Sequence, residues 1–421
     1  MLKDADLGQI CLRSPTCPRS DTFGRAKPSA DLILPLSSFR TVIYRAILSS
    51  MTSHLAPVAL MQLALQHARR GEGFVESNPM VGAVVASPNG AIISVGWHER
   101  FGGPHAEINA IRAAGSATVG SDLYVTLEPC SHFGKTPPCA DAVIAAGFRR
   151  VFVGCQDPAS HVAGQGLKKL RDAGIEVTVG LCEADARRLI APFEMWVCNH
   201  RPWVHAKWAM TLDGRIASRT GHSKWISSAE SRTVVHQLRG RMDAIITGAG
   251  TVRSDDPLLT ARPPGPRTPL RVVIDADGAS LQSGTKLVSS LAEGPVIACV
   301  SEQIPSGECD RLQSLGVEVF PCPADRVGRI DIASVLNQLG RRGCTNVLTE
   351  AGPGILGSLF DSSLIDEVHV FIGARLVGGD RASTPIGGTG REFLSAMPNV
   401  TRIRHTSIGD DLLIEGDVLR D

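Results

Sequence analysis

The first half of the chain is best interpreted from one stretch, LEPCSHFGKTPPC at residues 127–139, together with HAE at residues 105–107. His105, Cys130 and Cys139 supply one imidazole and two sulfurs, a ligand set that suits tetrahedral zinc. Three protein ligands leave the fourth position for water, whose pKa zinc lowers to about 7. Glu107 lies on the first turn of a predicted helix, where we expect it to shuttle protons beside the metal. The pattern therefore predicts a hydrolytic zinc centre with Glu107 as its catalytic residue.

Two other interpretations of this stretch stay open. A closed structural zinc site would need a fourth ligand, and His132, between the two cysteines, is the candidate. The base deaminases carry H-x-E followed by P-C-x-x-C, whereas eight residues separate Cys130 from Cys139. A structural site would give Glu107 no role and would more often use C-x-x-C pairs, so the open, catalytic site is favoured.

Apolar runs and helical patterns alternate on both sides of this stretch. Strands are predicted at 81–85, 91–95, 122–127, 151–154 and 176–179, and helices at 57–70, 106–114, 140–146 and 166–173. The rhythm restarts near residues 198–202, with strands at 203–210, 244–247, 271–274, 296–300, 317–320, 346–349 and 367–372 and helices at 228–239, 332–340 and 355–361. Such alternation predicts mostly parallel α/β sheets. We expect two α/β domains, at 54–198 and 199–421, after a poorly ordered extension at 1–53.

The composition excludes several classes of protein. Lys and Arg total 43 against 42 Asp and Glu, and aromatic residues make up 5%, which argues against a nucleic-acid-binding surface. No apolar run reaches the roughly 18 residues of a membrane helix. Eleven cysteines in 421 residues suggest cytoplasmic thiols or metal ligands rather than a secreted disulfide framework. We expect a cytoplasmic protein that binds a small molecule, and neither nucleic acid nor a membrane.

A glycine pattern in the second half suggests a phosphate site. Gly352, Gly354 and Gly357 satisfy G-x-G-x-x-G between a predicted strand and a predicted helix, where backbone N–H groups can face a phosphate. The alternative is a glycine turn that serves helix packing. Asp366 and Glu367 precede the next strand instead of ending it, which argues against a standard NAD-binding Rossmann domain and is compatible with NADP.

A second loop of the same kind is TGAGT at residues 247–251, flanked by Arg239, Arg253 and Arg262. Any one of these arginines is as readily a solvated surface residue. Trp225 follows the polar run Gly221 to Lys224 and is interpreted either as a core residue or as part of a lid over a ligand.

The chain resembles the bifunctional deaminase–reductase family of riboflavin biosynthesis. The cysteine loop at 127–139, NPMVG at 78–82 and DP at 157–158 resemble its deaminase half, and KWAMTLDGRIA at 207–217, DDPLLTAR at 255–262 and the loop at 350–357 resemble its reductase half. Residues 1–53 have no counterpart in the family, and IAPF at 190–193 departs from the Asn that the family often carries. The resemblance implies a cytidine-deaminase-like three-layer domain followed by a dihydrofolate-reductase-like α/β domain.

The resemblance also implies an activity and site residues. The activity is zinc-dependent hydrolytic deamination of 2,5-diamino-6-ribosylamino-4-pyrimidinone 5'-phosphate, then NADPH-dependent reduction of the ribosyl group to a ribityl chain. Asn78 would orient the substrate in the first site. NADPH would be held by Ala209, Trp225, Thr251, Asp255, Gly352, Gly354 and Gly357. The ribose-phosphate substrate would be held by Ser223, Arg239, Leu259, Arg262 and Glu350. Arg239 and Arg262 would pair with the phosphate in bidentate fashion, and we expect a homodimer or higher homo-oligomer.

Three competing functions remain at this level: a base deaminase acting on nucleic acid, a metal-binding scaffold without turnover, and a deaminase with a vestigial reductase half. The net charge of +1 argues against a deaminase of nucleic acid, and the open metal position argues against a scaffold without turnover. Only an assay of the second step separates the third.

Overall fold

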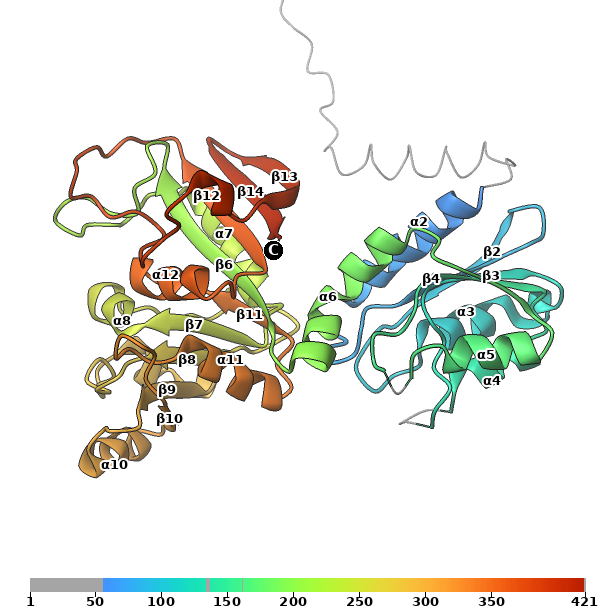
Figure 1. The fold of residues 1–421 in the computed structure, drawn as a ribbon, viewed down its shortest axis with the longest axis horizontal. Coiled ribbons are helices and arrows are strands. Elements are labelled where there is room, and N and C mark those ends of the chain that lie inside the picture. Colours follow the sequence, from blue (N-terminus) through green and yellow to red (C-terminus); the bar gives the residue numbers. More distant parts are fainter. Residues whose placement is uncertain (1–55, 134–136, 161, 420–421) are drawn as a thin grey trace, which may run out of the picture. The chain divides into compact units, whose positions relative to one another are not determined.

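The computed structural model describes residues 56–133, 137–160 and 162–419, so the predicted extension at 1–53 lies outside the described residues. In these ranges, none of the helices combines the length and the apolar character that crossing a bilayer requires. Two β-sheets organise the described chain (Figure 1).

The first sheet has the strand order β2-β1-β3-β4-β5. Its strands are β1 (Gly82–Ala86), β2 (Ile92–Trp97), β3 (Asp122–Leu127), β4 (Arg150–Cys155) and β5 (Glu176–Val179). β3, β4 and β5 are parallel, whereas β1 is antiparallel to both β2 and β3. The expected mostly parallel sheet therefore holds except at β1, which runs against the other four strands because the Pro88-Asn89-Gly90 turn joins it to β2 as a hairpin.

Helices cover both faces of this sheet, which confirms the three-layer domain (Figure 1). α2 (Pro57–Ala68) and α6 (Glu183–Asn199) pack on one face through Leu60, Met61, Leu189 and Ile190. α3 (Ala106–Ala114), α4 (Cys139–Ala145) and α5 (Gln165–Asp172) pack on the other. The patterns did not predict α6, which carries Pro192 in its interior. The predicted domain boundary, between 198 and 199, falls at the C-terminal end of this helix.

The second sheet has nine strands in the order β10-β9-β8-β7-β11-β6-β12-β14-β13. They are β6 (Trp203–Thr211), β7 (Ala244–Gly248), β8 (Leu270–Ile274), β9 (Val296–Ser301), β10 (Glu318–Cys322), β11 (Asn346–Thr349), β12 (Glu367–Gly373), β13 (Val400–Ile408) and β14 (Asp411–Val418). All pairs from β10 to β12 are parallel, and β14 and β13 add an antiparallel edge. The sequence patterns did not predict this last hairpin.

This sheet is also covered on both faces, so the expected second α/β domain is confirmed. α11 (Ile332–Arg341) and α12 (Pro353–Asp361) pack against one face. The other face carries α7 (Ala229–Arg239), α8 (Ala249–Asp255), α9 (Lys286–Ser289) and α10 (Ser306–Ser314). The described residues also form short 3₁₀ helices: η1 (Arg69–Gly71) and η2 (Gly115–Thr118) in the first half of the chain, and η3 (Leu291–Glu293) and η4 (Leu394–Ala396) in the second.

The order of the parallel strands positions the two glycine loops. β7 leads into α8 through Gly248, and its neighbour β11 leads through Glu350 into α12. In an open parallel sheet, ligands bind at the carboxyl ends of the strands. The loops at 247–251 and 350–354 therefore lie side by side at the edge where a ligand is expected.

Candidate active sites

The structure brings the three predicted metal ligands together. His105 caps the N-terminus of α3, Cys130 follows β3, and Cys139 is the first residue of α4. His105 Nδ1 lies 3.2 Å from Cys139 Sγ and 3.7 Å from Cys130 Sγ. Ligands of a tetrahedral zinc ion with ordinary bond lengths would lie about 3.6 Å apart, so these donors fit zinc.

Cys130 is prepared for binding as a thiolate. The backbone N–H of Cys139 donates to Cys130 Sγ at 3.3 Å. The side chain of Cys139, this N–H group and His105 together lower the pKa of the Cys130 thiol to about 4. The start of α4 thus supplies both a ligand and a donor that stabilises the neighbouring ligand.

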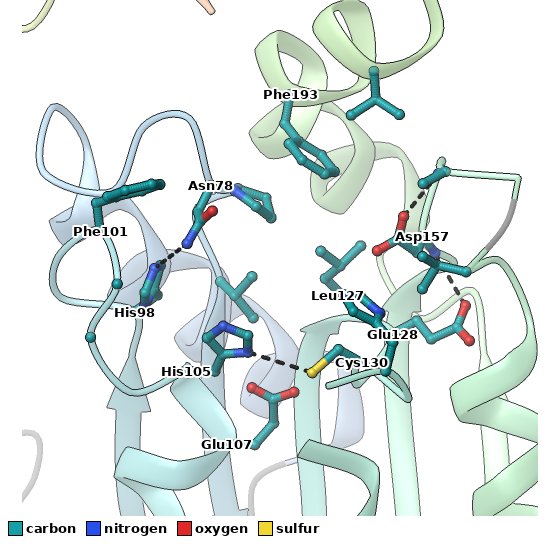
Figure 2. Close-up of a pocket in the computed structure, with 18 residues that line it drawn as sticks. Asn78, His98, Phe101, His105, Glu107, Leu127, Glu128, Cys130, Asp157 and Phe193 are labelled. Atoms are coloured by element: carbon teal, nitrogen blue, oxygen red, sulfur yellow. Dashed lines mark hydrogen bonds between the residues drawn. The ribbon is translucent and has the colours of Figure 1, made fainter. Parts of the chain in front are cut away.

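Glu107 lies beside this group, with its carboxylate directed toward His105 and Cys130 (Figure 2). The residue is 3% exposed, and its Oε2 atom has no hydrogen-bond partner among the described residues. Burial raises the pKa of this carboxyl to about 7. An unpartnered buried carboxylate oxygen is costly for a fold unless a ligand or water uses it.

A cavity of about 370 Å³ opens over these residues. Asn78 lines it, as predicted for a residue that faces the substrate, and its Nδ2 lies 3.1 Å from His98 Nε2 (Figure 2). His132 also lines the cavity, but it is not part of the group whose ligand atoms lie within 4.8 Å of one another. The described residues therefore do not form a closed structural site with His132 as the fourth ligand.

Two contributors to this cavity were missed from the sequence. Phe193 and Val197 of α6 form part of its lining, and the helix itself had not been predicted (Figure 2). Glu128 had been noted only as part of the motif. Its buried carboxylate accepts backbone hydrogen bonds at 2.9 to 3.3 Å from Asp157 and Gly164, in the loop after β4, and from Gly166 and Leu167, in the first turn of α5. Glu128 thus fixes the loop that carries the cavity wall at Asp157.

The second sheet carries two adjoining cavities, of about 680 and 570 Å³, which share seven lining residues: Lys207, Ala209, Ile216, Ser223, Thr251, Asp255 and Glu350. The larger one is lined by five of the predicted cofactor residues, Ala209, Thr251, Asp255, Gly352 and Gly354. The smaller one is lined by Trp225 and by all the predicted substrate residues, Ser223, Arg239, Leu259, Arg262 and Glu350. Two predicted sets that are distant in sequence therefore meet in one cleft.

Trp225 is 59% exposed, with the Arg232 guanidinium 4.4 Å from its ring centroid. This exposure rules out the core interpretation. Gly357 also departs from expectation, because it lines neither cavity. A Cβ at this position would lie 2.4 Å from the carbonyl carbon of Gly387. Of the three glycines in the pattern, Gly357 therefore serves helix packing, while Gly352 and Gly354 face the cleft.

A bidentate contact with the substrate phosphate was expected for Arg239. Its guanidinium is instead engaged by groups of the protein. Its Nε and Nη2 atoms donate to Glu350 at 2.6 and 3.0 Å, and Nη1 donates to the carbonyl oxygen of Thr260 at 3.2 Å. Arg262 is likewise engaged, with Nη1 donating to Thr260 Oγ1 at 2.7 Å. The bidentate partner of Arg239 is thus a carboxylate of the protein itself.

Lys207 was missed as a site residue. Its Nζ lies 3.5 Å from Glu350 Oε2, and burial lowers the pKa of its ammonium group. Lys207 follows His205 by two positions on β6, so both side chains point to one face of the sheet. A lysine between the apolar residues Ala206 and Trp208 of a strand is the signal that could have found it.

The comparisons with known proteins cover both halves. The model of the cytidine and deoxycytidylate deaminase zinc-binding region matches residues 57–155, and that of the RibD C-terminal domain matches residues 202–414. Riboflavin biosynthesis protein RibD of Aquifex aeolicus is 38% identical over 355 residues, which are 84% of this chain and 96% of the relative. The protein of the same name from Bacillus amyloliquefaciens is 39% identical over 353 residues, 84% of this chain and 94% of that one.

Solved structures agree with this result. The structure of Acinetobacter baumannii RibD, form 1, aligns with a TM-score of 0.74 at 31% identity, over 86% of this chain and 99% of that chain. A Thermotoga maritima structure, described as a diaminohydroxyphosphoribosylaminopyrimidine deaminase/5-amino-6-(5-phosphoribosylamino)uracil reductase, aligns with a TM-score of 0.73 at 34% identity, over the same shares. The similarity therefore extends over both sheets and their connection.

Proposed function

Because the chain belongs to the RibD family of riboflavin biosynthesis proteins, we propose that it performs two consecutive reactions on one phosphorylated pyrimidine. It is a bifunctional enzyme, with a zinc-binding deaminase region and a reductase domain that uses a nicotinamide cofactor. The proposed substrate is 2,5-diamino-6-ribosylamino-4-pyrimidinone 5'-phosphate, the compound that the sequence resemblance implied.

The first reaction is the hydrolytic removal of the ring amino group. His105, Cys130 and Cys139 would hold zinc, which when bound would lower the pKa of a water molecule so that hydroxide is available as the nucleophile near neutral pH. Glu107 would take one proton from that water and deliver it to the ring nitrogen, and it would then move the second water proton from the added hydroxyl to the amino group, which leaves as ammonia. The observation that carries this proposal is the unpartnered Oε2 of Glu107 beside the three ligands. Asn78 would orient the pyrimidine from the opposite wall of the cavity.

The second reaction is the reduction of the ribosyl group to a ribityl chain. NADPH, when bound, supplies a hydride. Gly352, Gly354, Thr251 and Asp255 would hold the cofactor in the larger cavity, next to Ala209. The substrate would lie in the smaller cavity, against Ser223, Leu259 and Arg262, with Trp225 at its exposed side. Glu350 and Lys207, on the wall that both cavities share, would contact both molecules, and Arg239 would hold Glu350 in place.

We assign the deaminase reaction to residues 54–198 and the reductase reaction to residues 199–421, with the chain acting as a homodimer or higher homo-oligomer in the cytoplasm. The edge strand β13 supports association, because it ends the second sheet and exposes Val400 and Ile403, with Phe393, Leu394 and Met397 exposed just before it. The described cysteines are free thiols, as expected in a reducing compartment. Size-exclusion chromatography with light scattering tests the oligomeric state.

An assay with two separate readouts tests the proposed function. The zinc-loaded protein is incubated with the diaminopyrimidine ribotide and NADPH, and ammonia and NADPH are measured independently. The proposal predicts equimolar release of ammonia and oxidation of NADPH. Ammonia release without NADPH oxidation would identify a deaminase with a vestigial reductase half. Release of ammonia from single-stranded DNA or tRNA in preference to the ribotide would contradict the proposal.

A further inference from the structure

A second cluster of metal-ligating side chains lies in the reductase sheet, away from both sites described above. It consists of His205 on β6 and Glu367 and His369 on β12, all of them buried. Glu367 and His369 are two residues apart on one strand, so their side chains share a face of the sheet. His205 is paired directly with Glu367 across the parallel β6–β12 ladder. The strand register alone therefore assembles the three side chains.

The distances between the ligand atoms match those around a metal ion. His205 Nδ1 lies 3.1 Å from His369 Nε2 and 3.4 Å from Glu367 Oε2, and His369 Nε2 lies 3.7 Å from Glu367 Oε1. Two nitrogen ligands at ordinary zinc distances and a tetrahedral angle lie about 3.4 Å apart. Two imidazoles and one carboxylate form a ligand set that suits zinc and its neighbours in the first transition row.

The outer nitrogen of each imidazole is already bound to an acceptor. His205 Nε2 lies 3.1 Å from the side-chain oxygen of Asn346, and His369 Nδ1 lies 3.0 Å from the carboxylate of Glu415. With these oxygens as acceptors, a neutral ring carries its proton on the outer nitrogen and turns the lone pair of its inner nitrogen toward the cluster. This is the outer contact that histidine ligands of metals characteristically make.

The inner nitrogens then direct two lone pairs at each other across 3.1 Å. Two neutral imidazoles in this arrangement cannot form a hydrogen bond, so the contact needs a cation between them, either a proton or a metal ion. A proton carried by His369, which faces the carboxylates of Glu367 and Glu415, is the alternative to a metal ion, and the metal content of the protein distinguishes the two.

The surroundings leave part of the Glu367 carboxylate available. Arg188 donates to Oε2 at 2.7 Å and Trp203 Nε1 does so at 3.3 Å. Arg188 is also engaged by Asp417 at 2.6 Å, so its charge is shared between two carboxylates. The Oε1 atom lies 3.5 Å from the half-exposed Arg404 and 3.7 Å from His369 Nε2. One oxygen of Glu367 is thus anchored, while the other faces His369.

We propose that His205, Glu367 and His369 form a second metal site, which takes one divalent transition-metal ion of the zinc type and links β6 to β12. The three residues line a cavity of about 480 Å³, together with Asn346 and Glu415, which gives an ion access to the cluster. This site is independent of the metal centre at His105, and it goes beyond the proposed two-step activity.

Metal stoichiometry tests the proposal on the full chain. The protein is equilibrated with Zn²⁺, freed of excess metal by gel filtration, and its zinc content is measured by mass spectrometry. We expect two zinc ions per chain in the unaltered protein. Glu367→Gln and His369→Gln should each reduce the content to one, and Cys130→Ser should also reduce it to one by removing the other site. Glu415→Gln should weaken binding at the second site about 10- to 100-fold.

The matched control is His405→Gln on β13, an exposed histidine outside the cluster, which should retain two ions. Co²⁺ added to Cys130→Ser gives a readout that does not depend on the altered cluster: the proposal predicts visible bands of nitrogen and oxygen ligation. One zinc per chain in the unaltered protein would overturn the proposal, and so would two zinc ions retained in both Glu367→Gln and His369→Gln. Ammonia release depends on the His105 centre and should persist in the second-site variants, so failure of this proposal and failure of the two-step activity are distinguishable.

Discussion

Arg239 and Glu350 form a two-pronged ion pair with N–O distances of 2.6 and 3.0 Å, in which Glu350 lines both reductase cavities and Arg239 lines the smaller one. Arg239 ends α7, and Glu350 follows β11, so the pair joins a helix to the carboxyl end of a neighbouring strand. Lys207 approaches the same carboxylate from β6 at 3.5 Å. The carboxylate of Glu350 is therefore neutralised within the protein before any ligand binds.

Removing one partner of this pair should be costly. Arg239→Ala leaves the buried carboxylate of Glu350 with Lys207 as its remaining basic partner among the described contacts, and we expect a loss of about 3–5 kcal/mol in the free energy of unfolding. Denaturant unfolding measures this change. Arg253→Ala, which removes an exposed arginine from α8, is the matched control and should change stability by less than about 0.5 kcal/mol. Equal effects of the two substitutions would contradict the assigned role of Arg239.

The same carboxylate predicts a dependence of stability on pH. Arg239 and Lys207 hold the pKa of Glu350 at about 2, below its ordinary value of 4.5. The folded protein therefore keeps Glu350 ionised where the unfolded chain would be protonated. The stabilising contribution is complete above about pH 4.5 and is lost as the pH falls toward 2. Unfolding of the wild type and of Glu350→Gln, measured across this range, should show the advantage of the wild type shrinking as the pH falls; a constant difference would refute the coupling.

Glu128 should control the wall of the deaminase cavity. Glu128→Ala removes the acceptor of four backbone N–H groups in the segment from Asp157 to Leu167. We expect a loss of roughly 1–3 kcal/mol in stability and a higher KM for deamination, because buried donors lose their partner. The exposed Glu72→Ala serves as control. An unchanged KM in Glu128→Ala would show that the loop is held by other contacts.

Two glycines of one motif should respond differently to alanine. Gly357→Ala places a Cβ 2.4 Å from the carbonyl carbon of Gly387 and should destabilise the reductase half. Gly354→Ala meets nothing within 4 Å and should fold normally. Because Gly354 lines the cofactor cavity, its substitution should instead raise the KM for NADPH. Thermal unfolding and NADPH titration of both variants check this contrast, and similar behaviour of the two would contradict it.

The sequence predicted most clearly what depends on local chemistry. The spacing of His105, Cys130 and Cys139 identified a metal group that the structure assembles, because two helix starts and a strand end fix those positions. The sequence patterns did not predict α6, because Pro192 lies within this helix and is unfavourable there, and tertiary packing nevertheless maintains the helix. The hairpin β13–β14 was also missed, because β13 lies at the sheet edge and is largely exposed, so it lacks a core pattern.

The site contacts that could not be predicted from the sequence are made by residues that only the order of the strands in the sheet brings together. His205 and Glu367 are far apart in sequence and become neighbours only through the β6–β12 pairing. The contact of Arg239 with a phosphate stays a prediction of the family resemblance, and nothing in the sequence pointed to the carboxylate that the structure places beside this arginine. Only the adjacency of β11 to β7 and β6 brings Glu350 within its reach.

The central claim is that two separate sites carry out the two reactions, and Glu107→Gln tests it most directly. The exposed Glu99→Gln serves as control. Ammonia release from the diaminopyrimidine ribotide and NADPH oxidation on the deaminated substrate are measured on each variant. Glu107→Gln should lower ammonia release by at least about 100-fold, because a positioned proton-transfer group contributes that much, while NADPH oxidation stays at the level of the control. Loss of both activities in a folded Glu107→Gln protein, or undiminished ammonia release, would contradict the account.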